Sequence, residues 1–326
     1  MLLLLFLIYG LSPVNPCHPN DLSAILHFKN SFSNSDLLSE WSSDMNCCHI
    51  FTCENNRIIE FTLDIYDLSG SLKPDALAGL TYLKRLRLHK MPFLIGEIPP
   101  AIENLTHLTY LEITWTNISG PIPQNLANLI NLNTLDFSFN KLYGSIPLSL
   151  LTLPNIFSID LSRNQLTGPI PESYGQIPNT HNLLVLILSH NKLSGKLPAS
   201  LGSMNFSRID LSRNNLSDDA SMLFGATKGC QVLDISRNNF EFDFSRVEFM
   251  DESLQILDIS HNKIYGKIPQ LITEASMLQG LNFSYNRLCG EIPNGWKLRY
   301  RSEGFDNSSF SHNRCLCGAP LDPWKF

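Results

Sequence analysis

Side chains that could act as acids, bases or nucleophiles recur in step along this chain. The carboxylate row is Glu112, Asp136, Asp160, Asp210, Asp234 and Asp258, broken by Ile187 and ended by Asn282. The serine row is Ser138, Ser162, Ser189, Ser212, Ser236, Ser260 and Ser284, and the basic row is Arg163, His190, Arg213, Arg237 and His261, flanked by Trp115, Phe139 and Tyr285. Hydrolysis needs two carboxylates, or a nucleophile and a base, that converge in one cleft. Rows at a constant pitch instead favour recognition over a long surface.

The sequence contains none of the short motifs that are typical of catalysis or metal binding. It has no H-E-x-x-H, no glycine-rich nucleotide loop, no G-x-S-x-G and no C-x-x-C pair. Cys315 and Cys317 alone are too few for a zinc site. We therefore predict a protein that is not an enzyme and that needs no cofactor.

Asparagine marks the repeat that positions the three rows. Its spacing ranges from 23 residues between Asn117 and Asn140 to 27 between Asn164 and Asn191, and leucine-like residues lie three, five and eight positions before it. The full set is Asn117, Asn140, Asn164, Asn191, Asn214, Asn238, Asn262 and Asn286. L-x-x-L-x-L-x-x-N is the leucine-rich-repeat pattern, in which each coil adds one strand to a shared sheet. The asparagines themselves are predicted to be structural, because a buried amide can satisfy backbone groups of two coils.

A second element, L-x-G-x-I-P, follows the asparagine, as at 118–123, 142–147 and 166–171, and is similar to the plant-specific class of this repeat. The predicted fold is an α/β leucine-rich-repeat solenoid, a right-handed superhelix of about ten 24-residue coils. It should carry a curved parallel sheet on the concave side, short 3-10 or helical segments on the convex side, and caps closed by disulfides. The long interval before Asn191 predicts an inserted loop near 178–181.

The chain divides into four parts. Residues 1–16 open with an apolar run and are predicted to be a signal peptide, 17–57 the N-terminal cap, 58–293 ten repeats and 294–326 the C-terminal cap. Within the first cap, a helical pattern runs from Asn20 to about Trp41, with Asp21 placed to cap its start. The net charge of −6 argues against nucleic acid as the main partner. No second apolar run is long enough to anchor the chain in a membrane, so we expect a secreted monomer.

The predicted binding surface is the concave face, to which the non-leucine strand positions point. The candidate residues are Trp115, Asp136, Asp160, Arg208, Asp210, Arg213, Gln231, Asp234, Arg237, Gln255, His261 and Gln279. Departures from the repeat pattern, such as Arg208, Trp115 and the glutamines, are favoured, since Trp and Arg often anchor protein interfaces. Alternatively, the acidic and basic rows simply neutralise one another. Glycosylation is predicted at the sequons of Asn104, Asn205, Asn215 and Asn307.

The closing run 305–321 resembles the C-terminal cap of plant polygalacturonase-inhibiting proteins. Asn46-Cys47-Cys48 and the segments 261–266 and 286–290 resemble the same family, so the resemblance covers nearly the whole mature chain. It implies a cell-wall or apoplastic protein that binds microbial or insect endopolygalacturonases on its concave face and obstructs their substrate cleft. Gln231, Gln279, Asp136 and Asp210 match positions that vary in the family. The basic row is linked there to pectin or oligogalacturonide binding, although His190 and His261 stand where stronger bases are common.

The resemblance also implies the disulfides. They are Cys17–Cys47, Cys48–Cys53, which closes a shorter loop than the family usually has, and Cys289–Cys315. Cys317 is then left outside the disulfides, because Trp324 stands where the family's last cysteine should be. Cys230 occupies a leucine position and is expected to be a small buried hydrophobe.

Two other functions remain open from the sequence. One is a soluble ligand-binding or co-receptor-like signalling module acting in development, which a complex with a receptor kinase would favour. The other is ice binding, known among relatives of the inhibitor family. Ice adsorption favours a flat, often Thr-rich array, whereas the inner rows here are Asp, Ser and Arg.

Overall fold

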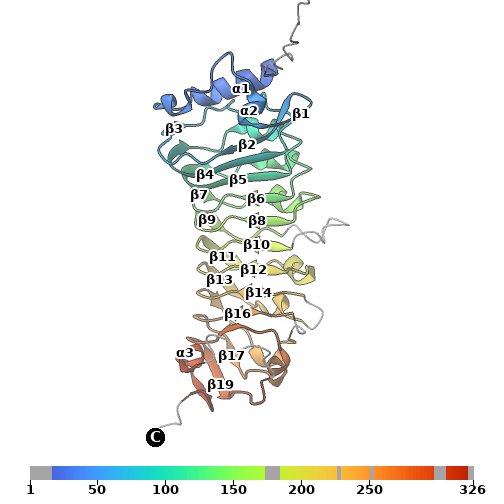
Figure 1. Ribbon diagram of the computed structural model, residues 1–326. Helices are drawn as coiled ribbons and strands as arrows, with labels where there is room; N and C mark the ends of the chain where they lie inside the picture. The colour runs from blue at the N-terminus through green and yellow to red at the C-terminus, as the bar shows by residue number, and fades with distance from the viewer. Residues whose placement is uncertain (1–16, 173–183, 226–228, 250–252, 297–305, 322–326) are drawn as a thin grey trace, which may run out of the picture.

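The computed structural model describes residues 17–172, 184–225, 229–249, 253–296 and 306–321, which stack into an elongated solenoid from the N-terminal to the C-terminal end (Figure 1). The expected signal peptide at 1–16, the loop expected near 178–181 and Trp324 lie outside these residues.

The inner sheet is built from one parallel strand per coil. In order these strands are β2 (Arg57–Leu63), β4 (Arg85–Gly96), β5 (Tyr110–Pro121), β6 (Thr134–Asp136), β8 (Ser158–Asp160), β10 (Val185–Ile187), β12 (Arg208–Asp210), β14 (Val232–Asp234), β16 (Ile256–Asp258) and β18 (Gly280–Asn282). Each pairs with the next along the chain. Their middle residues, such as Leu135, Ile159 and Leu186, align in register and are fully buried. The predicted leucine-rich-repeat fold is confirmed.

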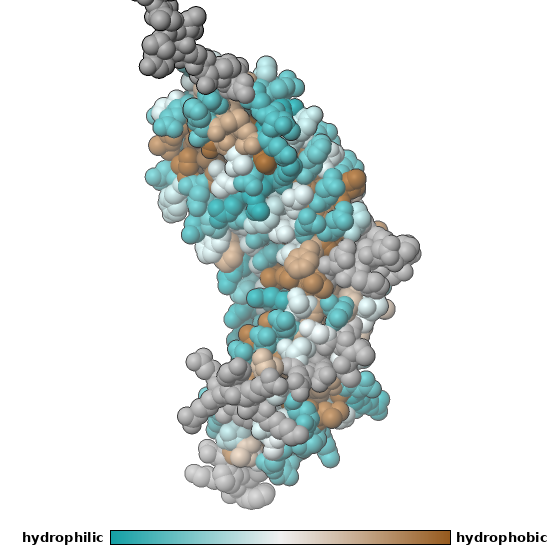
Figure 2. All heavy atoms as spheres, turned by 45° about the vertical axis from the view of Figure 1, so that its right-hand side comes forward, coloured by the Kyte–Doolittle hydropathy of each residue, from teal (hydrophilic) through white to brown (hydrophobic). Residues whose placement is uncertain are grey.

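Shorter parallel strands run along the flank of the solenoid. They are β3 (Gly70–Ser71), β7 (Lys141–Gly144), β9 (Gln165–Gly168), β11 (Lys192–Lys196), β13 (Asn215–Asp218), β15 (Asn239–Phe240), β17 (Tyr265–Gly266), β19 (Arg287–Glu291) and β20 (Cys315–Cys317). β3 pairs with β4 and β7 pairs with β5, whereas β17, β19 and β20 form a separate three-stranded sheet. Convex 3-10 helices follow these strands: η2 (Pro100–Asn104), η3 (Gln124–Asn128), η4 (Leu148–Thr152), η6 (Ala199–Ser203), η7 (Ser221–Leu223), η8 (Phe244–Arg246) and η9 (Gln270–Glu274). A proline ends the strand before η2, η3, η4, η6 and η9, because it has no N–H to extend a ladder. Helices η7 and η8 instead follow Ala220 and Asp243. On the face seen in Figure 2, hydrophilic residues surround smaller hydrophobic groups.

The asparagine ladder ties neighbouring coils together. The Nδ2 of Asn238 donates to the Leu211 carbonyl of the preceding coil at 2.9 Å and to Ile235 at 3.2 Å, while its Oδ1 accepts from the Leu216 N–H at 3.0 Å. The same pattern recurs from coil to coil, so each amide satisfies backbone groups that would otherwise be buried without partners.

The ladder differs from the prediction at both ends. In the third coil the ladder position is Thr116, not Asn117, because the buried pair Leu111 and Ile113 sets an offset of five and three residues. The Thr116 hydroxyl bonds the Asn140 Oδ1, whereas Asn117 donates to the Pro92 carbonyl. At the other end, Asn313 adds a rung that the repeat pattern did not predict, and its Oδ1 accepts from the Leu288 N–H.

The N-terminal cap differs in helix length and in the role of Asp21. Helix α1 (Pro19–Lys29) ends at Asn30, well before Trp41, and is followed by η1 (Ser35–Leu38) and α2 (Cys47–Ile50). His18 caps α1, since its Nδ1 accepts from the Asn20 N–H. Asp21 is instead buried at 1% exposure and receives hydrogen bonds from the Arg57 guanidinium and the Ile58 N–H. The expected N-cap is therefore wrong. β1 (Thr52–Glu54) pairs antiparallel with β2 and covers this edge.

The C-terminal coils fill their core with phenylalanine where the L-x-G-x-I-P element is lost. Phe244 is fully buried, and its ring lies 5.8 Å from Phe224, 5.6 Å from Phe249 and 5.4 Å from Phe283. Helix α3 (Asn307–Phe310) then closes the inner sheet, because the Ser309 carbonyl accepts from the Phe283 N–H.

Disulfides occur in both caps. They join Cys17 to Cys47, Cys48 to Cys53 and Cys289 to Cys315. Cys230 is buried, with its thiol 3.2 Å from the Val232 carbonyl, and Cys317 is half-buried at the end of β20.

Candidate partner-binding surface

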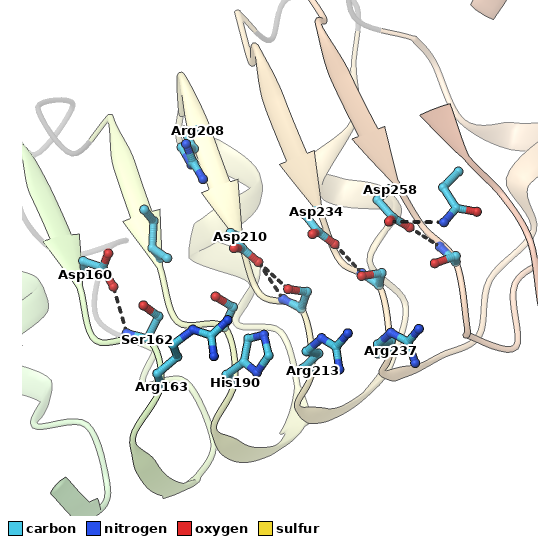
Figure 3. A pocket seen from close by; sticks show the side chains of 16 residues that line it. Asp160, Ser162, Arg163, His190, Arg208, Asp210, Arg213, Asp234, Arg237 and Asp258 are labelled. Carbon is cyan, nitrogen blue, oxygen red and sulfur yellow. Dashed lines mark hydrogen bonds between the residues drawn. The ribbon is translucent and has the colours of Figure 1, made fainter. Parts of the chain in front are cut away.

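An open hollow of about 460 Å³ lies on the inner sheet between β8 and β18 (Figure 3). It is lined by Asp160, Ser162, Arg163, Ile187, Ser189, His190, Arg208, Asp210, Ser212, Arg213, Asp234, Ser236, Arg237, Asp258, Ser260 and Asn282. The structure thus brings together six of the predicted residues: Asp160, Arg208, Asp210, Arg213, Asp234 and Arg237. Asp136 and His261 occupy the same two rows without lining the hollow, and Trp115 stands at the N-terminal end of the basic row.

Each carboxylate is fixed by the turn that follows its strand. Oδ1 of Asp136, Asp160, Asp210, Asp234 and Asp258 accepts from the backbone N–H of the serine two residues later at 2.8–3.0 Å. Asn282 accepts from Ser284 in the same way, at 3.1 Å. This local hydrogen bond explains why the motif D-x-S recurs from coil to coil, since Asp and Asn favour such turns. The carboxylates form a row and do not converge as a hydrolytic pair.

Burial changes the acidity of these groups. It raises the pKa of Asp136 and of Asp234 to about 6, with neighbouring carboxylates adding to the shift, and it also raises the pKa of Asp160. Burial lowers the pKa of His190 and His261, and the nearest arginines lower it further: Arg163 and Arg213 for His190, and Arg237 for His261. The histidines therefore stay neutral to lower pH than free imidazole does.

The basic row has an unusual backbone. Its members and their flanking residues, from Lys90 to His312, lie in the left-handed region with φ between 53° and 59°, which is uncommon for residues other than glycine. The turn is held because the next residue, the ladder asparagine, bonds carbonyls two and three positions back. Trp115 stacks on Phe139 at 3.8 Å with Arg163 beyond it at 4.8 Å, and His261, Tyr285 and His312 stack at 4.2 and 4.1 Å. His312 belongs to this row although the sequence pattern placed it in the cap.

The acidic and basic rows do not pair with each other. Within the described chain, the guanidiniums of Arg163, Arg208, Arg213 and Arg237 take part in no ion pair. The buried serine row lies between the carboxylate row and the basic row (Figure 3). The alternative that the two rows neutralise one another by direct contact therefore does not hold, and these four charges remain available to a ligand.

The N-terminal end of the face is, by contrast, satisfied internally. Glu112 is buried and accepts from Arg87 Nε at 3.0 Å, from the Tyr110 hydroxyl at 2.7 Å and from Thr114 Oγ1 at 2.9 Å, and His89 Nδ1 lies 3.2 Å away. Burial opposes its ionisation, yet these donors together lower the pKa of Glu112. Burial and Glu112 raise the pKa of Tyr110 to about 12. Arg85 stacks over the Tyr110 ring at 4.0 Å.

The three glutamines lie just ahead of the strands. Gln231, Gln255 and Gln279 precede β14, β16 and β18, and a backbone ladder joins them, with N–H to carbonyl distances of 2.8 Å and 2.7 Å. They do not line the hollow. The sequon residues Asn104, Asn205, Asn215 and Asn307 are all exposed.

The raised acid pKa values predict a pH-dependent stability. The folded protein holds protons on Asp136 and Asp234 between pH 3.8 and about 6, where the unfolded chain has released them. The contribution of these two groups to the free energy of unfolding is therefore fully present below pH 3.8. It is lost as the pH rises through 6, by up to about 3 kcal/mol per group. Asp234→Asn should raise Tm at pH 7 more than at pH 4, measured by circular dichroism. Asn282→Asp, the reciprocal change, should steepen the loss, and equal pH slopes in all three proteins would contradict the expectation.

Family models match both the cap and the coils. A model described as "Leucine rich repeat N-terminal domain" matches 18–53, and "Leucine Rich Repeat" matches 131–153, 155–177, 182–204, 253–274 and 277–298. Among the described residues, no helix combines the length and apolar character needed to cross a bilayer.

Known proteins resemble this chain over nearly its full length. "Polygalacturonase inhibitor" from Pyrus communis is 48% identical over 95% of this chain and 92% of its own. "Polygalacturonase inhibitor 2" from Arabidopsis thaliana is 45% identical over 95% and 93%. A solved plant ice-binding protein superposes with a TM-score of 0.84 at 39% identity, covering 94% of this chain and 98% of its own. Given the identity and coverage of the two inhibitors, this chain belongs to the polygalacturonase-inhibitor family of leucine-rich-repeat proteins.

Proposed function

We propose that this protein is secreted to the plant cell wall and inhibits microbial or insect endopolygalacturonases by covering their substrate cleft with its concave face. The observation that carries the proposal is the hollow with four guanidiniums that form no ion pair in the described chain. Because these charges are carried by a rigid sheet, little conformational entropy is lost when a partner binds them. Two nearly full-length relatives that carry the inhibitor name support the same reading.

The inhibitor performs no chemistry in this mechanism. Burial raises the pKa of Asp160 and Asp234, and each carboxylate of the hollow accepts a hydrogen bond from a backbone N–H. Arg208, Arg213 and Arg237 would bind carboxylates on the enzyme, with Asp160, Asp210 and Asp234 selecting among partners. Gln231, Gln255 and Gln279 would contact the enzyme beside the strands, and Trp115, Asp136 and His261 would extend the surface along the rows.

The basic row would also bind pectin or oligogalacturonide. Its exposed guanidiniums, Arg163, Arg213 and Arg237, follow one another along the solenoid axis with His190 between the first two. A linear polyuronate lying along that axis would meet several of them in turn. The neutral histidines make this binding weaker at pH 7 than a row of arginines would.

The test is a titration of several fungal and insect endopolygalacturonases with the purified full chain at pH 5, read by release of reducing sugars. Stoichiometric loss of activity against one enzyme is expected. Arg213→Glu with Arg237→Glu should weaken inhibition by at least about 100-fold, while Lys141→Glu with Lys196→Glu, exposed on the flanking sheet, should leave it unchanged. Absence of inhibition across the panel by a folded sample would overturn the proposal.

Ice binding is a second candidate, favoured by the 39% identity to the plant ice-binding protein. It predicts thermal hysteresis and faceted ice crystals at micromolar protein. Against it, the described inner rows are charged and alternate in sign across the face. Ordinary ice growth in the presence of the folded protein would exclude ice binding and would leave the inhibitor proposal unaffected.

A further inference from the structure

The concave face carries an aliphatic strip beside its charged rows. The first residues of β10, β12, β14, β16 and β18 are aligned by strand pairing: Val185, Arg208, Val232, Ile256 and Gly280. They alternate with buried leucine-like residues, so their side chains share the face of the carboxylate row. We call Val185, Val232 and Ile256 the aliphatic seam. In the N-terminal half the same position carries Glu60, Arg85, Tyr110, Thr134 and Ser158.

Ile256 is the most open member of the seam, with 43% of its surface exposed. Its neighbour in register is Gly280, whose φ lies outside the left-handed region. A Cβ placed there would meet Ile256 Cγ1 at 3.7 Å, which is ordinary van der Waals contact. Neither backbone conformation nor space therefore requires glycine. Its effect is to leave one side of Ile256 uncovered, as a notch that an apolar side chain can fill.

The charges around the seam indicate what would cover it. On the strand between Val185 and Val232 stands Arg208, exposed and without an ion pair in the part of the chain that the structure describes. Asp234 and Asp258 follow Val232 and Ile256 at a distance of two residues, and beyond the serine row lie Arg213 and Arg237. A polyuronate would gain from the basic row, but it has no apolar group for the notch beside Ile256.

We propose that the aliphatic seam docks a polypeptide segment that inserts an aliphatic or aromatic side chain between Ile256 and Gly280 and places carboxylates on Arg208 and the basic row. The proposal rests on the inhibitor function and adds to it two points. The enzyme is held on coils six to ten, not on the internally satisfied end around Glu112. The protein and the polyuronate share the basic row, but substitutions in the seam can distinguish them, because only the protein uses the seam.

The test measures the Kd of the full chain for an endopolygalacturonase by surface plasmon resonance, and separately for an oligogalacturonide by calorimetry. Ile256→Ser should weaken enzyme binding by about 10- to 100-fold, and Gly280→Val, which fills the notch, should weaken it similarly. Both variants should bind the oligogalacturonide within about twofold of wild type. Ile256→Leu should retain enzyme affinity. The matched control is Ile130→Ser, because Ile130 is 55% exposed on the turn after η3, away from this face.

The outcomes separate the two proposals. If the wild type binds no endopolygalacturonase, the proposed inhibitor function is overturned, and so is the proposal that this enzyme docks on the seam. If the wild type binds and the folded Ile256 and Gly280 variants bind equally well, the seam alone is overturned. Loss of oligogalacturonide binding with enzyme binding intact would instead assign the seam to the polysaccharide, and would also overturn it.

Discussion

Asp21→Ala should destabilise the N-terminal cap by about 3–5 kcal/mol, because it leaves the Arg57 guanidinium, whose side chain is only 12% exposed, without its counter-charge. Asp21 is 1% exposed, and its carboxylate accepts from Arg57 Nε at 3.1 Å and Nη2 at 2.7 Å and from the Ile58 N–H at 2.8 Å. It thereby links α1 to the first strand of the inner sheet, across 36 residues. Chemical denaturation followed by circular dichroism should show an early transition absent from wild type, and hydrogen exchange should assign it to α1.

The matched control for this change is Asp75→Ala. Asp75 also pairs with a basic residue of the cap, His27 at 3.2 Å, but its side chain is 65% exposed. A solvent-exposed pair contributes about 0–1 kcal/mol, so the midpoint should hardly move. Equal midpoints for the Asp21 and Asp75 variants would show that the buried pair does not hold the cap. Removing both Asp21 and Arg57 should recover part of the lost stability, since no charge is then left unpaired.

Phe244→Ala should cost about 3–5 kcal/mol through the cavity it leaves. The ring is fully buried at the start of η8 and packs edge-on against Phe224, Phe249 and Phe283, which belong to coils seven, eight and ten. Because the coils of a solenoid share one core, the loss should spread to both neighbours of coil eight. Urea unfolding should show it as a lower midpoint, and hydrogen exchange should be faster from β13 to β18.

Phe93→Ala provides the comparison, because Phe93 is 49% exposed and its ring touches Tyr66 at 6.2 Å. A loss below about 1 kcal/mol is expected there. Phe244→Leu should fall between the two. An alanine variant at 244 that unfolds with the wild-type midpoint would mean that the aromatic cluster can collapse into the space.

The repeat itself was predictable because the asparagine and its leucines are spaced by the coil, and the coil is a local structure. Asn238 makes its bonds two or three residues back and one coil away, as the period implies. The prediction of the asparagine ladder was wrong at positions where residue type and the spacing of the buried residues disagree. Asn117 attracted the ladder assignment because it is an asparagine, yet the buried positions Leu111 and Ile113 place Thr116 there. Asn313 was missed because helix α3 stands in place of the strand before it.

The residues of each row on the candidate surface were predictable from the sequence, but the contacts between one row and the next were not. Strand alternation placed Asp210 and Asp234 on the concave face, and the structure confirms that placement. That the guanidiniums avoid the carboxylates depends on the left-handed turn at Arg213 and Arg237, for which the residue types give no signal. Asp21 was assigned to a helix cap because its partner, Arg57, is remote in sequence. The seam at Ile256 became visible only with the register of five strands.

The hydrogen bond between each strand carboxylate and the backbone N–H of the serine two residues later affects how this surface can evolve. Because it closes within one coil, as from Asp160 to Ser162 or Asp234 to Ser236, the geometry of a binding position is inherited together with its own coil. Recombination between related genes at coil boundaries should therefore transplant recognition positions intact, while the asparagine rungs re-form with any neighbour that offers a free carbonyl. New target ranges could then arise by shuffling whole coils, without a period of poorly folded intermediates.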